Sequence, residues 1–215
     1  MKKKLGVLRV APAENIAPRT EQAFWHNGAE IEIGLYARSL HRSAKLLLEN
    51  LDRRENPKTA WDVGPIITLY RQALELEMKF LVGEGGRFVA SPTDHLTLWK
   101  TQSLRWLAQI VCQVIQAVHW EAEFRCRGVQ GLTEFRAVIA ELEAMEPMAA
   151  VRYAKRSEQK PGDVPPQLRK ARLIEIAWKL DGLIELLAAT ADGLAAMAGW
   201  MDLGAGDDGE KRLVH

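Results

Sequence analysis

The sequence predicts an all-α protein, built as an up-and-down bundle of about four long helices with shorter helices between them. Three observations predict this fold class. Apolar residues recur at three- and four-residue steps over long segments, which is the period of an amphipathic helix. No segment alternates apolar and polar residues over the length of a strand between turn signals. Proline- and glycine-rich loops separate the periodic segments, so consecutive helices can turn back on one another.

The first two predicted helices flank a charged loop. The first begins near Asn27, carries one apolar stripe, and ends before Pro57, which cannot continue a helix. The second is predicted to begin at Gly64-Pro65 and to stop near Val82, where glycines cluster. Its apolar arc covers more than half of the helix circumference, so we expect it to lie at the centre with neighbours on several sides.

The remaining helices follow the same period. We expect a long third helix over residues 94–120, two short helices near residues 132–145 and 147–154, and a final helix over about residues 167–199. A polar, proline-rich loop precedes the last of these.

The chain divides into three predicted parts. Residues 1–26 have little periodicity and are expected to form an irregular N-terminal arm. Residues 27–200 are expected to form the helical bundle domain. Residues 201–215, rich in glycine and charge, are expected to be a disordered tail.

The composition is that of an ordinary globular protein. The chain has 215 residues, 47% of them hydrophobic and 27% charged, which is enough for a sizeable core. A net charge of +1 gives no global positive excess to attract nucleic acid or membranes. Only two cysteines are present, which favours reduced thiols in a cytoplasmic protein. No run of about 18 apolar residues occurs, so we expect no membrane partner.

The second helix carries a narrow polar stripe that includes Arg71, Glu75 and Lys79. The four-residue spacing lets Glu75 pair with both cations, which predicts a solvated ladder of ion pairs. Glu77 differs, because it falls inside the apolar arc beside Tyr70. A carboxylate there must be paired, protonated or facing a cleft, and a buried structural pair is favoured over catalysis.

Asp94 and His95 stand at the start of the third helix. One interpretation is a helix cap followed by a first-turn residue. The other places His95 near exposed backbone N–H groups that could hold a phosphate, where an imidazole could transfer protons.

Basic and aromatic residues are interleaved at two places, around Arg125 and Arg127 and around Arg152 and Tyr153. Such a mixture can hold a phosphate backbone and stack a base. It is equally typical of helix ends, where cations offset exposed carbonyl groups.

Standard cofactor and metal motifs are absent from the sequence. Cys112, His119 and Cys126 are spaced by seven residues, so the first two share a helix face, but the third lies beyond the predicted helix end. Without a fourth ligand this is not a zinc pattern, and we expect neither a metal nor another cofactor.

The run LYRQALELEMKFLV, followed by DHLTLW, resembles the helical HEPN-type proteins of bacteria. A later segment, EFRAVIAELEAMEPMAAVRYAKR, is also similar to a part of some of these proteins, and the resemblance spans residues 64–195. The residues that match the two short patterns are Tyr70, Arg71, Ala73, Glu75, Leu76, Lys79, His95, Leu96, Leu98 and Trp99.

The resemblance implies a helical bundle that dimerises and has an RNA-related or defence role. Several HEPN-type proteins are metal-independent ribonucleases, whereas others have lost catalysis and bind partners. The catalytic members carry an arginine followed a few residues later by a histidine, late in the domain. Here that spacing occurs once, at Arg19 and His26 in the N-terminal arm, and the last helix has no histidine.

We therefore expect a non-catalytic HEPN-like binding or regulatory module of a bacterial defence or toxin–antitoxin-type system. Its partners would be a second copy of the chain, RNA or a nucleotide, and another protein. One alternative is a metal-independent ribonuclease that uses His95 with Arg71 and Glu75. Another is a plain helical-bundle interaction protein. The candidate binding residues are Lys79, Asp94, Arg125, Arg127, Arg152 and Tyr153.

Overall fold

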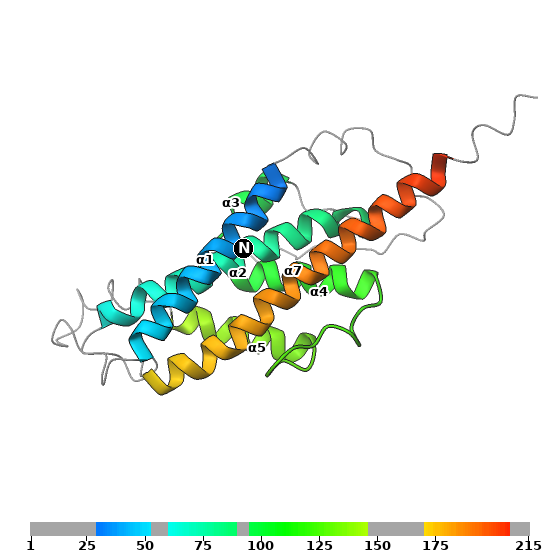
Figure 1. Ribbon diagram of the computed structural model, residues 1–215. Coiled ribbons are helices and arrows are strands. Elements are labelled where there is room, and N and C mark those ends of the chain that lie inside the picture. The colour runs from blue at the N-terminus through cyan, green and yellow to red at the C-terminus, as the bar shows by residue number, and fades with distance from the viewer. Residues whose placement is uncertain (1–28, 53–59, 90–94, 146–169, 207–215) are drawn as a thin grey trace, which may run out of the picture.

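A computed structural model describes residues 29–52, 60–89, 95–145 and 170–206 (Figure 1). Within these ranges the chain is helical and contains no strand, which confirms the all-α prediction. The predicted arm, the predicted helix over 147–154 and the end of the predicted tail lie outside the described residues.

Helix α2 (Ala60–Gly85) lies at the centre, in contact with α1 (Ala29–Asp52), α4 (Leu104–Ala117) and α7 (Lys170–Gly206). Figure 1 shows α1 and α7 running along the same face of the molecule. Buried residues lie on most sides of α2, so the expectation from its wide apolar arc holds.

Both ends of α2 lie further out than predicted. The helix begins at Ala60, which leaves Pro65 inside it at the cost of one backbone hydrogen bond. It continues through Gly83 to Gly85 and then into a short 3₁₀ turn, Gly86–Phe88. A Cβ atom on Gly85 would collide with Val114 of α4. The glycine there permits a close approach between helices rather than ending α2.

The predicted long third helix is two helices in the structure. Helix α3 (His95–Lys100) ends before residues 101–103, and α4 begins after Ser103. Ser103 has an extended backbone, and its Oγ accepts a hydrogen bond from Trp106 N at 3.3 Å. Serine is a favoured N-cap residue, so a new helix begins here although the apolar pattern of the sequence continues across it.

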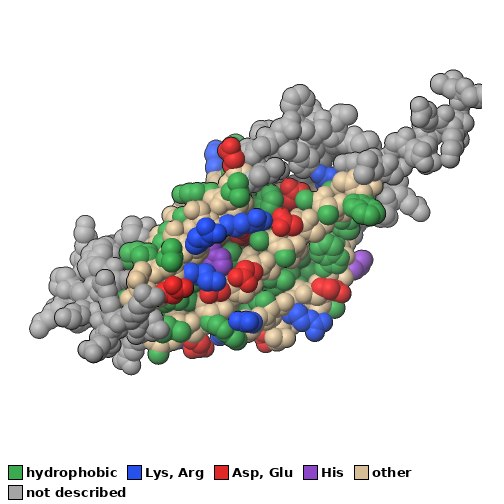
Figure 2. Space-filling model, viewed as in Figure 1, with side chains coloured by type: hydrophobic (Ala, Val, Ile, Leu, Met, Phe, Trp, Pro, Cys, Tyr) green, Lys and Arg blue, Asp and Glu red, His purple; other side chains and the backbone are tan. Residues whose placement is uncertain are grey.

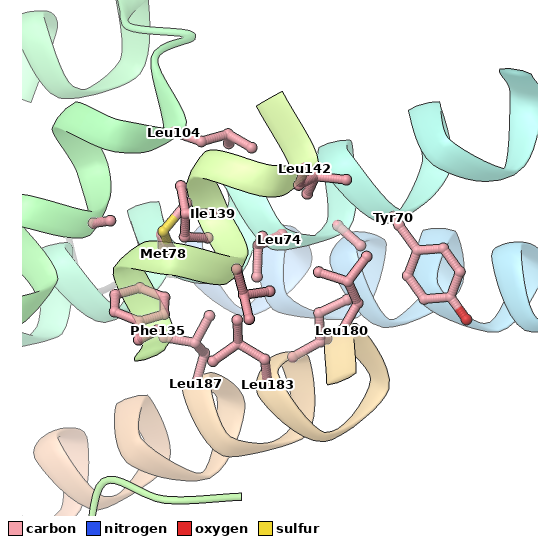
Figure 3. Packing of buried hydrophobic residues seen from close by; sticks show 14 of the residues in the cluster. Tyr70, Leu74, Met78, Leu104, Phe135, Ile139, Leu142, Leu180, Leu183 and Leu187 are labelled. Carbon is pink, nitrogen blue, oxygen red and sulfur yellow. The ribbon is translucent and has the colours of Figure 1, made fainter. Parts of the chain in front are cut away.

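Helix α5 (Leu132–Ala144) matches its prediction closely, whereas α7 continues past residue 199 to Gly206. Side chains of α1, α2, α3, α4, α5 and α7 meet in one hydrophobic core, part of which Figure 3 shows. The core residues labelled there are Tyr70, Leu74 and Met78 of α2, Leu104 of α4, Phe135, Ile139 and Leu142 of α5, and Leu180, Leu183 and Leu187 of α7.

Helix α7 is also apolar in composition. Within Ala171–Met201 an 18-residue window has a mean hydropathy of 1.3, so by length and composition alone this helix could cross a membrane. In the structure 39% of that window is buried inside the protein. A core helix passes the same test, so this is weak support for a membrane span.

Candidate functional site

The predicted polar stripe of α2 is a buried chain of ion pairs. Lys79 Nζ lies 2.7 Å from Glu75 Oε1, and Arg71 Nη1 lies 3.4 Å from Glu75 Oε2. The three side chains expose only 5% (Lys79), 13% (Glu75) and 18% (Arg71) of their surface. The pairing agrees with the sequence prediction, but the prediction of a solvated ladder is wrong. Ion pairs at this burial cost much more to break than exposed ones.

The same cations hold the C-terminal end of α3 and the segment that follows it. Lys79 Nζ donates to Trp99 O at 3.2 Å and lies 5.7 Å from the centre of the Trp99 ring. Arg71 Nη2 donates to Gln102 O at 2.7 Å. Carbonyl groups at a helix C-terminus lack intrahelical partners, and cations also offset the negative end of the helix dipole. The polar stripe of α2 therefore fastens α3 and its connection to α4.

This arrangement bears on the predicted catalytic residues. Arg71 and Glu75 lie together and are bonded to each other. The other carboxyl oxygen of Glu75 is bonded to Lys79, and Arg71 also donates to the backbone carbonyl of Gln102. His95 is the first residue of α3, but its side chain lies outside the described residues, as does Asp94.

Asp181, near the middle of α7, joins three helices. Its Oδ1 accepts a hydrogen bond from the Tyr70 hydroxyl of α2 at 2.9 Å and lies 2.7 Å from His41 Nε2 of α1. An ionised carboxylate can only accept, so Nε2 carries the hydrogen. Burial and then the negative charge of Asp181 raise the pKa of Tyr70, so its hydroxyl stays protonated and donates.

Charged residues line the contact between α1 and α7, which we call the α1–α7 seam. Figure 2 shows basic, acidic and histidine side chains gathered over these two helices. Arg38 Nη2 pairs with Asp192 Oδ2 at 3.4 Å, and Lys45 Nζ lies 3.8 Å from Glu185 Oε1. The seam comprises Arg38, His41 and Lys45 of α1 with Asp181, Glu185 and Asp192 of α7. The two signs balance, so this face offers no strong attraction to a polyanion.

Glu77 of α2 is a buried acidic residue without a partner among the described residues. Its side chain is fully buried, and neither carboxyl oxygen has a hydrogen-bond partner. The predicted buried structural pair is therefore wrong, because no side chain donates to either carboxyl oxygen. Burial raises the pKa of Glu77 from an ordinary 4.5 to about 7, with Arg38 lowering it and Asp192 raising it by smaller amounts.

The basic residues Arg125 and Arg127 lie on a tight turn closed by backbone hydrogen bonds between Cys126 and Val129. Both arginines are exposed, and Arg125 Nε donates to Ala122 O at 2.6 Å. Gly128 in this turn has a left-handed φ of 73°. A side chain at this position would be strained by the backbone and would crowd side chains of α7. Arg152 and Tyr153 lie outside the described residues.

A Cβ atom on Gly128 would lie 3.0 Å from Trp178 Cζ3 and 3.0 Å from Lys179 Cγ. The turn therefore rests directly on α7, beside an indole that is 49% exposed. Cations and a half-exposed aromatic ring are adjacent here, although acidic residues Glu121 and Glu123 are also exposed nearby in the chain.

The described part of the chain holds no group of three or more His, Cys, Asp or Glu side chains placed to bind a metal ion. Of the sequence triplet, Cys112 is buried in α4, whereas His119 is exposed after the helix end.

Sequence reasoning missed His41 and Asp181. A signal existed, because His41 shares a helical stripe with Ala37 and Ala44, and Asp181 falls four residues after the buried Ala177. Polar residues in register with apolar stripes mark buried polar contacts.

Comparisons of the chain with protein-family models, with curated proteins and with solved structures find no match.

The burial of Glu77 predicts how stability changes with pH. Well below pH 4.5 the group is protonated in the folded and unfolded states, so it contributes nothing to the pH dependence of stability. As the pH rises from 4.5 to about 7, the unfolded state ionises first, so the folded state loses stability. The total loss is at most on the order of 3 kcal/mol. In Glu77→Gln this part of the pH dependence should vanish, as measured by urea unfolding between pH 4.5 and 8.

Glu185→Gln is the matched control, because Glu185 is an exposed glutamate of the same seam. Parallel pH profiles for wild type and Glu77→Gln would show that Glu77 ionises normally in the folded protein.

Proposed function

We propose that this chain is a non-catalytic, HEPN-like binding module of a bacterial defence or toxin–antitoxin-type system. One observation carries the proposal. The polar residues of α2, the helix that carries the first HEPN-like pattern, are bonded within the same chain. Tyr70 is bonded to Asp181, Arg71 to Gln102, and Lys79 to Glu75 and Trp99. A catalytic group must face a substrate, and these groups face the protein interior.

The fold supports the same proposal at a coarser level. Helices α1, α2 and α7 are long, and the α3–α4 segment occupies the place of a fourth. Such an arrangement is compatible with the up-and-down bundle of about four long helices that the HEPN resemblance implies.

We propose single-stranded RNA or a nucleotide as the ligand, bound at the turn of Arg125 and Arg127. Arg127 is exposed and has no charged partner in the described part of the chain. Next to the turn, Trp178 presents part of its indole to solvent. Guanidinium groups can hold phosphates while an indole stacks a base, and this mode needs no overall positive charge.

We also propose a homodimer formed through the outer face of α1. Four large apolar side chains are exposed there: Leu35, Tyr36, Leu46 and Leu47. Leu35 and Tyr36 form one pair and Leu46 and Leu47 a second, with Ser39 and Ser43 between them. If a second copy of α1 packed antiparallel to the first, the first pair of each copy would contact the second pair of the other. This self-complementary pattern is what a two-fold interface requires. Another protein could occupy the same face instead.

We also propose that the protein works in the cytoplasm, because both of its cysteines, Cys112 and Cys126, are free thiols.

The dimer predicts a specific variant. Leu46→Glu should leave the fold intact, because Leu46 is half exposed, but should bury an unpaired charge in the interface. Sedimentation should then find monomers where wild type sediments as a dimer. A monomeric wild-type protein would contradict the homodimer.

The binding proposal is tested with a labelled single-stranded RNA, by following binding and cleavage in the same reactions. Wild type and His95→Ala should both bind the RNA and leave it uncut. Trp178→Ala should weaken binding about fivefold or more, since base stacking contributes roughly 1–3 kcal/mol. With two phosphate contacts, affinity should fall about sevenfold between about 50 and 200 mM salt.

Two matched controls separate the turn from the general surface. Trp200→Ala removes a more exposed indole at the far end of α7, and Arg42→Ala removes an exposed cation of α1. Neither should change the affinity. If wild type cuts the RNA and His95→Ala does not, the ribonuclease alternative is correct. If no variant binds RNA, the protein-interaction alternative is left.

A further inference from the structure

Arg38 and Glu77 lie on neighbouring helices, at the point where α1, α2 and α7 meet. Arg38 of α1 and Asp192 of α7 are about half exposed and pair at 3.4 Å across the seam. On α1, Arg38 lies between Gly34, where a Cβ atom would lie 3.8 Å from the Phe80 ring of α2, and His41, whose ring centre is 5.9 Å from that of Tyr70. Arg38 therefore lies opposite the stretch of α2 that holds Glu77, which is buried with no hydrogen-bond partner. The arginine therefore has one carboxylate partner in solvent and a second carboxyl group in reach of its field.

Several other ionisable groups on the helices packed around α2 have partners of their own. Asp181 of α7 is held by Tyr70 and His41. Glu84, two turns further along α2, also has an interaction partner. Helix α4 packs against α2 as well, but its one charged residue, Arg105, pairs with Glu143. Arg38 is thus the cation placed to compensate a negative charge on Glu77.

The two possible pairs of Arg38 differ greatly in strength. The pair with Asp192 is solvent-exposed, and such pairs contribute little because water and salt screen them. An ionised Glu77 without a partner would be a buried, unpaired charge, which is among the most destabilising features a core can hold. Once Glu77 loses its proton to solvent, moving the guanidinium inward gains more than the surface pair loses.

We propose that Arg38, Asp192 and Glu77 form a proton-operated latch between α1 and α7. With Glu77 protonated, Arg38 pairs with Asp192 and closes the seam. When Glu77 releases its proton, Arg38 leaves Asp192, pairs with Glu77, and α1 loses that contact with α7. The latch is separate from the proposed RNA site, because its residue on α7, Asp192, lies about four turns along that helix from Trp178.

Carboxyl ¹³C and arginine ¹⁵N NMR titrations of the full chain test the latch. Glu77 should titrate with a midpoint near pH 7, and the Arg38 Nε signal should shift with the same midpoint. Arg38→Gln should move the Glu77 midpoint up, because it removes the compensating cation. Asp192→Asn should move it down, because it removes a repelling charge and frees Arg38.

Lys45→Gln is the matched control, as it removes a seam cation that pairs with Glu185 and should leave the Glu77 midpoint unchanged. A Glu77 signal that titrates near 4.5, or an Arg38 signal that does not follow Glu77, would overturn the latch. The wild-type titration alone decides between these outcomes if a variant fails to fold.

Discussion

The structure depends on one constraint, which is that α2 has packed neighbours on most of its circumference. A polar side chain on such a helix cannot rely on water, so its partner must come from another part of the chain. Tyr70 is bonded to Asp181 on α7. Lys79 is bonded to a backbone carbonyl in the last turn of α3, and Arg71 to one just after that helix. The polar residues of α2 therefore connect the helices around it, while its apolar residues form the core.

Glu77 shows what happens when the constraint is not met. It occupies the same face of α2 as Tyr70, two turns away, but no side chain donates to it. Burial raises the pKa of this carboxyl group to about 7, so the stability of the folded protein depends on pH between 4.5 and about 7. The unpaired carboxyl group thus lies beneath the α1–α7 seam, and α1 is also the helix with the exposed apolar face.

Local patterns were sufficient to predict most of the helices. The stripe of α1, the wide arc of α2 and the short α5 follow directly from the spacing of apolar residues. The break at Ser103 was not predicted, because the apolar period continues across it and a cap depends on backbone geometry. The continuation of α2 through Gly83 was also missed, since the need for glycine at Gly85 arises from Val114 on another helix.

The candidate site was predictable only where its contacts are local. Pairing of Glu75 with Arg71 and Lys79 follows from four-residue spacing on one helix. The burial of these pairs depends on α3 packing over them, which no spacing reveals. The bonds of Asp181 join residues more than 100 positions apart in the sequence, so they could be found only in the folded chain.

The central claim is that the polar residues of α2 hold the fold together. Its most direct test is the free energy of unfolding of Lys79→Met beside that of Lys100→Met, a change at an exposed lysine of α3. Lys79→Met should lose about 3 kcal/mol, because it leaves Glu75 buried without its closest partner. Lys100→Met should stay within about 0.5 kcal/mol of wild type. Equal, small losses for the two variants would contradict the claim and would return Lys79 to the candidates for direct ligand binding.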